Sequence, residues 1–381
     1  MILLFFSDIP WYGLHQRPQH ITEALAKKWP VLWIEPTTLL KKSHFRPLTI
    51  APNIHILSIP AIPYNARFAW MRAVALPLSH VPGVRNMVTI VQRFLIRRAL
   101  RLLGKGERVA AVVNNFHSID VLDGLPTSFL LYDYIDNAFG FVALPEHVKE
   151  AWEKTIRKAN AITVTSEELA RQLQPLRSSG ITYVGNGVEY EHFAHPNTSE
   201  CPPDLRRGQP VVCYSGAVYP WLDYDLLRFT LQKMPDVHFL FLGPVHPDVE
   251  QITRELAEMG NSSFPGFKPY AMLPQYFKYI DVGIIPFQLN ELTKSVNPVK
   301  LYEYSAAGKP TVATQFSSDL LPFRDTILLA RTNEEFVSQL RIALKQSHDP
   351  AVVSGLQAFA RQHDWSTKTS IITDLIAHHH N

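Results

Sequence analysis

Short apolar runs alternate with helical patterns along almost the whole chain, and this alternation constrains the fold more than any other feature. Apolar runs of strand length occur at 2–6, 31–34, 109–114, 128–134, 161–165, 181–184, 211–214, 238–242, 281–285 and 311–314. Helical patterns lie between and after them, at 17–29, 88–103, 146–158, 167–174, 223–234, 248–258, 273–278, 299–307, 333–346 and 350–377. Strands that alternate with helices favour parallel sheets with helices on both faces, so the predicted fold class is α/β.

The alternation restarts after a polar, proline-containing stretch at 193–209, which is the best linker candidate. A chain of 381 residues also exceeds one ordinary hydrophobic core. We therefore expect two Rossmann-like, doubly wound domains, an N-terminal one over 1–195 and a C-terminal one over 205–355. A last helix, 356–381, could return to the N-terminal domain, and the proline-rich stretch 36–66 is expected to be loop.

The composition is that of a globular protein, with 46% hydrophobic and 19% charged residues and a net charge of +3. Two cysteines, Cys201 and Cys213, cannot build a disulfide framework and indicate a reducing compartment. The N-terminus lacks the basic region of a signal peptide and reads as a first core strand. No apolar run approaches the ~18 residues of a membrane-spanning helix, so we expect a cytoplasmic protein.

Residues 297–314 form the most informative local unit. Pro298 suits the first turn of a helix, and Gly308 suits a left-handed cap after it. The start of such a helix offers free N–H groups and a positive dipole end, and Lys300 adds a cation there. Glu303 follows one turn later, where a carboxylate can accept both hydroxyls of a ribose. These groups together suggest a site for a nucleoside diphosphate; the alternative is a surface helix with ordinary capping.

This segment closely resembles the donor-binding helix of GT-B glycosyltransferases, in the bacterial form P-x-K-L-x-E-Y-x-A-x-G-K-P. Asn186-Gly187-Val188-Glu189-x3-Phe193 is similar to the N-G-V-D-x3-F element of the same enzymes. The resemblance is to glycosyl transferases of group 1, of the teichuronic-acid and exopolysaccharide type. It implies two Rossmann-like domains facing across a cleft that holds the ligand. It also implies that Glu303 binds the donor ribose and that the helix start, with Pro298, faces the diphosphate.

Further donor-binding residues are expected around this helix. Ser215 and Gly216 follow an apolar strand, where the backbone can pass close to a phosphate. Family members commonly carry an Arg and a Lys downstream of this loop, whereas this chain has Tyr219, Pro220 and Trp221. That departure leaves the diphosphate charge to Lys300, the helix dipole and Lys294. The nucleobase is expected near Phe267.

Many retaining members of the family carry a Glu eight residues before the ribose Glu, and this position is Ser295 here. The incomplete pair leaves the retaining mechanism open. Ser295 and Asn297 are expected to contact sugar or phosphate as neutral donors. Asp223 and Asp225 match the D-x-D pattern of metal-dependent transferases of another fold, but both stand where helix capping already favours acids. No metal and no cofactor beyond the nucleotide-sugar co-substrate is predicted.

Candidate catalytic residues follow strands of the first half, since doubly wound sheets bind ligands at the carboxyl ends of their strands. They are Asp136, Asp133, His117 and Asp8. An inverting transfer needs one base for the acceptor hydroxyl, and we favour Asp136, then Asp133. The alternative for each is a loop residue that forms turn hydrogen bonds.

The acceptor is expected near Trp11, Tyr12, Gly13 and Arg17. The aromatic rings offer faces for a sugar, and Arg17 could bind a phosphate bidentately. The segment Arg17-Pro18-Gln19-His20 resembles an R-P-Q-H element of the same bacterial family, although Arg17-Pro18 could simply start a helix.

Basic residues concentrate between Arg67 and Arg108, where the single acid is Glu107. The helical pattern 88–103 places several of them beside apolar side chains, which is typical of a helix that lies on an anionic membrane surface. A solvated face of a core helix is the alternative. Nucleic-acid binding is not expected, because no recognised module accompanies the basic run.

The sequence thus predicts a metal-independent glycosyltransferase of the hexosyltransferase type. It would move a sugar from a nucleotide-diphosphate sugar to a saccharide or lipid-linked saccharide acceptor in cell-surface polysaccharide assembly. The expected location is the inner face of the cell membrane, bound peripherally. Two alternatives remain, a GT-B-like sugar-nucleotide epimerase and a catalytically silent module that binds nucleotide or a partner.

Overall fold

The computed structural model describes residues 1–12, 15–37, 43–62, 69–104, 107–137, 146–196, 200–205 and 208–378. The chain divides into two compact units. Unit 1 comprises Met1–Val184 and the residues from Thr369 onward, and unit 2 comprises Gly185–Lys368. The first unit thus ends earlier than position 195, and the segment with Gly187 and Phe193 belongs to the second unit.

Unit 1 contains an eight-stranded sheet in the order β3-β4-β2-β1-β5-β6-β7-β8. Its strands are β1 (Ile2–Phe6), β2 (Val31–Pro36), β3 (Leu48–Ala51), β4 (Ile54–Ile59), β5 (Val109–Val113), β6 (Thr127–Tyr134), β7 (Ala161–Val164) and β8 (Ile181–Tyr183). All neighbours pair in parallel except β3 and β4. The chain winds outward from β1 in both directions, so the switch point of this doubly wound sheet lies between β1 and β5.

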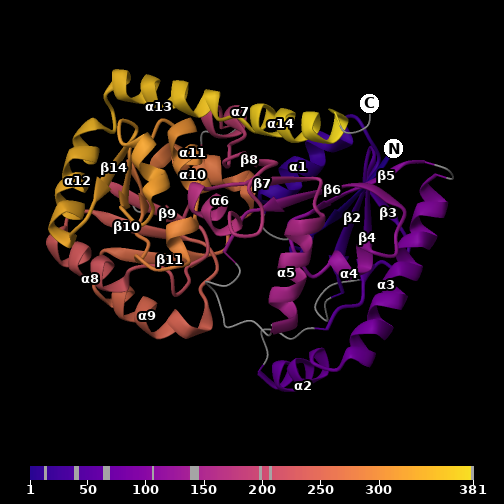
Figure 1. Cartoon of the computed structure of the whole chain (residues 1–381). Helices are drawn as coiled ribbons and strands as arrows, with labels where there is room; N and C mark the ends of the chain where they lie inside the picture. Colours follow the sequence, from indigo (N-terminus) through magenta and orange to yellow (C-terminus); the bar gives the residue numbers. More distant parts are fainter. Residues whose placement is uncertain are drawn as a thin grey trace. The chain divides into compact units, whose positions relative to one another are not determined.

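Helices cover both faces of this sheet (Figure 1). They are α1 (Arg17–Ala26), α2 (Ala69–Ser79), α3 (Pro82–Leu103), α4 (Ile119–Leu122), α5 (Glu146–Lys158), α6 (Glu167–Leu173) and α14 (Trp365–His378). One core joins Ile21 of α1 and Ile372 of α14 to Trp33 of β2. The other joins Ile96 of α3 and Ile156 of α5 to the opposite face of the sheet. Burial on both faces explains why the strands read as continuous apolar runs.

Unit 2 contains a six-stranded parallel sheet in the order β11-β10-β9-β12-β13-β14. Its strands are β9 (Val211–Ser215), β10 (His238–Leu242), β11 (Ser262–Gly266), β12 (Val282–Ile285), β13 (Thr311–Thr314) and β14 (Ile327–Ala330). Its switch point lies between β9 and β12. The helices are α7 (Tyr190–Ala194), α8 (Tyr224–Lys233), α9 (Glu250–Glu258), α10 (Leu273–Tyr279), α11 (Val299–Ala306), α12 (Asn333–Gln346) and α13 (Pro350–Gln362). The buried apolar residues of this unit that the structure describes form one core.

The predicted α/β class with two doubly wound parallel sheets is confirmed. Two predictions of local structure are wrong. The proline-rich stretch contains strands β3 and β4, which extend the sheet of unit 1. The predicted helix 350–377 is two helices, α13 and α14. The break at Asp364 forms because Asp364 pairs with Val188 in a parallel bridge, and the amide of Trp365 donates to the Val188 carbonyl.

Candidate functional site

The start of α11 presents unpaired backbone donors at the carboxyl edge of the unit 2 sheet. Pro298 is the N-cap residue rather than the first helical residue, with φ −77° and ψ 118°. The first bond of the helix runs from the Leu301 amide to the Pro298 carbonyl at 3.2 Å. The amides of Val299 and Lys300 precede it, so they lack a partner within the helix. Gly308 has φ +69°, as expected of the residue that ends the helix.

Tyr304 fixes α11 against the switch point of the sheet. Strands β9 and β12 pair only at Val212 with Val282 and at Cys213 with Gly283. Beyond these pairs the Tyr304 hydroxyl accepts a hydrogen bond from the Ser215 amide at 2.8 Å and donates one to the Cys213 carbonyl at 3.1 Å. A Cβ on Gly283 would lie 2.3 Å from the Tyr304 ring, so glycine makes room for this wedge. The Tyr304 hydroxyl thus bonds to the β9 backbone where β9 and β12 no longer pair. This is the switch point, where doubly wound sheets bind their ligands.

Two glycines bring backbones into close contact at the same edge. Gly216 follows β9 and has φ +145°, and Gly243 follows β10 and has φ +154°. A Cβ on Gly243 would lie 1.9 Å from the Gly216 carbonyl oxygen, which only glycine tolerates. A Cβ on Gly216 would lie 2.3 Å from Cε of Lys300. The Lys300 side chain therefore lies directly against the predicted phosphate loop, with Nζ 5.8 Å from the Tyr214 ring centre.

Glu303 is buried and Lys300 is half-buried, and the two side chains interact electrostatically. Glu303 is 9% exposed. Burial raises the pKa of the Glu303 carboxyl to about 7, with Glu189 adding to the rise and Lys300 opposing it. Burial also lowers the pKa of Lys300, and Glu303 opposes that change. A buried carboxyl with its pKa raised this far is typical of a functional site.

Asn297 holds the Asn186 segment beside α11. Its side-chain oxygen accepts hydrogen bonds from the Asn186 amide at 2.9 Å and from the Tyr302 hydroxyl at 3.2 Å. The Asn186 side chain returns a bond to the Asn297 carbonyl at 2.7 Å. Asn297 is therefore engaged within the protein, and we assign it a positioning role instead of a direct contact with the donor.

The other predicted donor-binding residues differ in how accessible they are to a ligand. Ser295 is buried, and its hydroxyl donates to the Leu292 carbonyl at 2.8 Å. Lys294 pairs with Glu291, which reduces its value as a second cation for the diphosphate. Phe267 follows β11 and is 52% exposed, so its ring is available to a ligand.

The two acids of the D-x-D pattern behave as helix-capping residues. Asp223 caps α8 and accepts a hydrogen bond from the Leu226 amide at 2.9 Å. Asp225 in the first turn lies 3.5 Å from Arg228. Both positions are those that the helix dipole favours for acids.

In unit 1 the structure places Asp8 and His117 on the two sides of the switch point, after β1 and β5. Both side chains reach solvent. Limited hydration raises the pKa of Asp8, which His117 opposes, and lowers the pKa of His117, which Asp8 opposes. The charges of Asp8 and His117 therefore affect each other's pKa at the switch point.

Asp133 and Arg17 form a buried ion pair, and this changes the predicted roles of both. Arg17 donates from Nε and from a terminal nitrogen to the two Asp133 oxygens, at 2.9 and 2.8 Å. Thr163 donates a third hydrogen bond to Asp133 at 2.6 Å. Both side chains are almost fully buried. Neither the predicted base role of Asp133 nor the predicted phosphate role of Arg17 fits these contacts, so we assign the pair to positioning.

Asp136 is the exposed acid at this strand end. Limited hydration raises its pKa to about 6, Asp133 adds to the rise, and Arg17 opposes it. Nearby, Trp11 lies edge-on against Trp33, with ring centres 5.0 Å apart, so part of its surface is used in packing. Tyr12 is 65% exposed. Gly13 lies outside the described residues.

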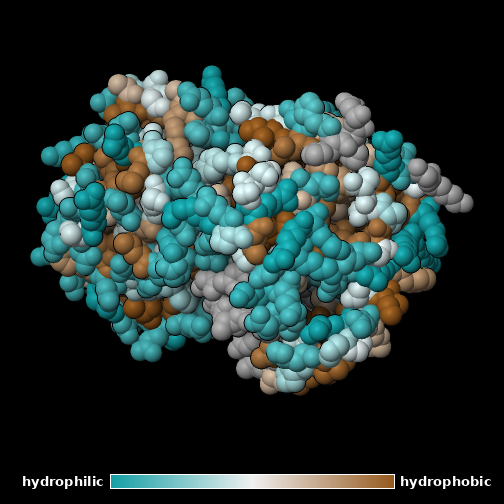
Figure 2. All heavy atoms as spheres, viewed as in Figure 1, coloured by the Kyte–Doolittle hydropathy of each residue, from teal (hydrophilic) through white to brown (hydrophobic). Residues whose placement is uncertain are grey.

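The helices α2 and α3 carry an apolar surface on unit 1. Exposed apolar side chains on them are Val74, Leu76, Leu78, Met87, Ile90, Val91, Phe94 and Leu102. Brown side chains are visible over these helices in Figure 2. Not all of the basic residues share this surface, because Arg93 and Arg97 donate to carbonyls at the end of α4. For Arg98 and Arg101 the described part of the chain provides no partner. Among the described helices, none has the length and apolar character needed to cross a membrane.

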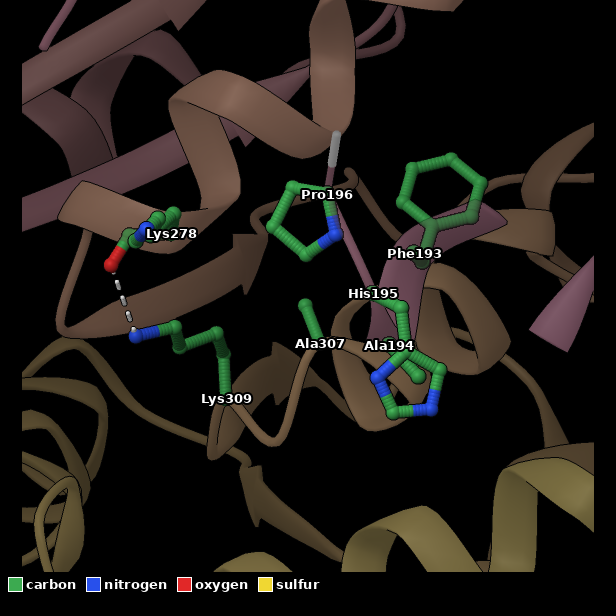
Figure 3. Close-up of a pocket in the computed structure, with 7 residues that line it drawn as sticks. All are labelled: Phe193, Ala194, His195, Pro196, Lys278, Ala307 and Lys309. Atoms are coloured by element: carbon green, nitrogen blue, oxygen red, sulfur yellow. Dashed lines mark hydrogen bonds between the residues drawn. The ribbon is translucent and has the colours of Figure 1, made fainter. Parts of the chain in front are cut away.

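A separate cavity of about 610 Å³ lies at the opposite end of α11. Figure 3 shows Ala307 and Lys309 on one side of it and Phe193, His195 and Pro196 on another. The Lys309 ammonium donates to the Lys278 carbonyl at 3.4 Å. This cavity adjoins the amino ends of the strands and is distinct from the helix start described above.

Comparison with known proteins agrees with this architecture. Residues 209–346 match the sequence model of the family "Glycosyl transferases group 1". The chain is 27% identical over 226 residues to the "Putative teichuronic acid biosynthesis glycosyltransferase TuaH" of Bacillus subtilis (strain 168). That match covers 58% of this chain and 57% of the relative, so the chain spans little more than half the length of this curated relative.

The fold is also that of solved transferase structures. Sucrose-phosphate synthase from Thermosynechococcus elongatus superposes with a TM-score of 0.71 at 16% identity, covering 99% of this chain and 98% of that one. HepE of Anabaena in complex with UDP superposes with a TM-score of 0.63 at 15% identity, covering 99% of each chain. The two Rossmann-like units therefore have the GT-B fold, and over residues 209–346 the chain is similar to the glycosyl transferases group 1 family.

Proposed function

We propose that the protein is a glycosyltransferase that moves a sugar from a nucleotide-diphosphate sugar to a saccharide acceptor in cell-surface polysaccharide assembly. The observation that carries the proposal is the start of α11. Two amides without helical partners, the Lys300 side chain against Gly216, and the buried Glu303 carboxylate lie within one helical turn. These groups match a diphosphate followed by a ribose diol.

The chain's own groups can stabilise the leaving diphosphate without a metal. Negative charge that develops on the diphosphate during transfer meets the α11 amides and the Lys300 ammonium, which are fixed in advance by Tyr304 and Asn297. Donors that need no reorganisation stabilise a transition state most effectively. We therefore propose metal-independent transfer. In this proposal the ribose hydroxyls bind to Glu303 and the nucleobase lies near Phe267.

The acceptor side of the proposal rests on unit 1. Asp136 is the favoured base, because it is exposed and its pKa of about 6 leaves it ionised at neutral pH. It would take the proton of the acceptor hydroxyl as that oxygen attacks the sugar. Asp8 and His117 are the alternative pair for the same step, and Tyr12 offers a face for the acceptor sugar.

We further propose that the acceptor is lipid-linked and that the protein binds peripherally to the inner face of the cell membrane through α2 and α3. Ile90 and Phe94 are 64% and 60% exposed on adjacent turns of α3, and Arg98 and Arg101 follow on the same helix. Apolar side chains beside free cations suit an anionic lipid surface, where each basic group contributes roughly 1 kcal/mol.

The test is donor turnover by the purified chain. Thermal-shift screening against UDP-, GDP-, ADP- and dTDP-sugars should reveal one class of stabilising donor, which is then assayed for release of nucleoside diphosphate. Glu303→Gln should abolish donor binding, while the control Glu255→Gln, on the exposed face of α9, should not. Stabilisation by no nucleotide sugar, or equal donor affinity in Glu303→Gln, would contradict the proposal. A sugar isomer formed without acceptor would instead identify an epimerase.

A further inference from the structure

Two histidines and an arginine lie where the link between α2 and α3 meets the start of α5 in unit 1. The rings of His80 and His147 contact each other edge to face, with centres 5.2 Å apart. His80 directly follows α2, and His147 lies in the first turn of α5. The Arg85 guanidinium donates to the Ser79 carbonyl at 2.9 Å, which fixes this cation beside His80. The polar group thus adjoins the apolar surface of α2 and α3.

Basic and acidic neighbours both act on His147. Burial lowers the pKa of His147, and Arg85, His80 and His117 lower it further, whereas Glu150 raises it. Glu146 is a second acid at the start of α5. Arg85 and the two imidazoles can all donate hydrogen bonds to one anion, and a bound anion would favour protonation of the imidazoles.

The position of the group relates it to the acceptor. His117 follows β5 at the switch point of the sheet, and its charge affects the pKa of His147. The cluster is therefore within electrostatic reach of the candidate catalytic groups, and His80 joins it to the exposed apolar helices α2 and α3. An amphipathic acceptor whose sugar lies at the catalytic groups and whose lipid lies on α2 and α3 would place its linking phosphate at His80, Arg85 and His147.

We propose that His80, Arg85 and His147 form a binding site for the phosphate or diphosphate group of the acceptor. This inference rests on the proposed function, since it assigns one part of the acceptor. Each cation would donate a charge-assisted hydrogen bond to a phosphate oxygen, and a bound anion would favour protonated imidazoles. Phosphate affinity should therefore increase as the pH falls from 8 to 6.

Binding is tested on the full chain with inorganic diphosphate as probe. The ring signals of His80 and His147, assigned with His80→Asn and His147→Asn, are followed by NMR during the titration, and they report on this site and not on α11. Binding to the His147→Asn variant is followed through the His80 signals. His147→Asn and Arg85→Gln should each weaken diphosphate binding about tenfold, as expected for one charge-assisted hydrogen bond. Arg101→Gln removes an equal charge from an exposed position of α3 and serves as the matched control.

The source of the phosphate is distinguished with vesicles. One preparation contains a polyprenyl diphosphate, and the other contains phosphatidylglycerol at the same negative charge. We expect His147→Asn to lose the preference for polyprenyl diphosphate while sugar-nucleotide hydrolysis without acceptor stays unchanged. The inference would be overturned by His147 signals that do not change during the titration. It would also be overturned if His147→Asn lost equal amounts of binding to both vesicle preparations. Absence of any sugar-nucleotide turnover in the wild type would instead refute the proposed function and leave the diphosphate titration as an independent result.

Discussion

Replacing Glu303 with glutamine should stabilise the unliganded protein at alkaline pH while removing its donor binding. The Glu303 carboxyl has its pKa raised from 4.5 to about 7 because it is buried in α11, an effect that Lys300 opposes and Glu189 increases. Between these two pH values the folded protein holds a proton that the unfolded chain has released. Stability of the wild type therefore falls as the pH rises through this window and stays lower above it.

The magnitude follows from the two pKa values. Each pH unit corresponds to about 1.4 kcal/mol, so the ionised carboxylate costs about 3 kcal/mol of folding free energy at pH 8. Glutamine has the same shape and no charge, so Glu303→Gln should unfold at higher denaturant concentration than the wild type at pH 8. At pH 4, where the wild-type carboxyl is protonated in both states, the two proteins should have nearly equal stability.

Denaturant unfolding at pH 4, 6 and 8 provides the measurement, with hydrogen exchange of the β9–β13 amides to follow unit 2 separately. The chain has two units, so one global transition cannot be assumed. Glu255→Gln again serves as control, because its exposed position should produce no pH-dependent gain. A Glu303→Gln variant that is less stable than the wild type at pH 8, or equally stable at all three pH values, would refute the reasoning.

Three further predictions concern other parts of the molecule. Tyr304→Phe removes the hydroxyl that bonds to the Ser215 amide and the Cys213 carbonyl, which should cost about 1–3 kcal/mol of stability. It should raise the donor KM more than it lowers kcat. An unchanged KM would contradict the positioning role of Tyr304. Asp136→Asn should reduce the rate of transfer by roughly 10²–10⁴-fold with donor affinity unchanged. The wild-type rate should increase as the pH rises through about 6, because the Asp136 carboxyl becomes ionised there. A fully active Asp136→Asn would assign the step to Asp8 and His117. Phe94→Asp should weaken sedimentation with anionic vesicles, whereas the similarly exposed Ile342→Asp in unit 2 should not; equal effects would argue against a membrane surface on α3.

The sequence was sufficient to predict elements whose signals are local. Strands β10 and β13 and helices α5 and α12 have the predicted bounds. Continuous apolar runs and well-placed capping residues determine such elements within a few neighbours. Helix α3 begins at Pro82, six residues before the predicted start, because proline fits a first helical turn. Strand β14 was not predicted, since four residues without flanking turn signals resemble any apolar loop.

The roles of polar residues were harder to predict, because their partners lie far away in the sequence. Arg17 and Asp133 are 116 residues apart and were assigned separately to phosphate binding and catalysis. Asn297 and Asn186 are 111 residues apart, and only their mutual hydrogen bonds reveal a positioning role. Tyr304 was read as part of a helical pattern, although its hydroxyl bonds to β9. The one available signal was Gly283, an isolated glycine inside a strand, which often marks the close approach of another group.

A structure of the chain with a bound nucleoside diphosphate tests the central claim most directly. The diphosphate should lie at the amides of Val299 and Lys300, with the Lys300 side chain over Gly216 and the ribose hydroxyls on the Glu303 carboxylate. A nucleotide bound elsewhere, or a Glu303 side chain that makes no contact with the ribose, would contradict the account.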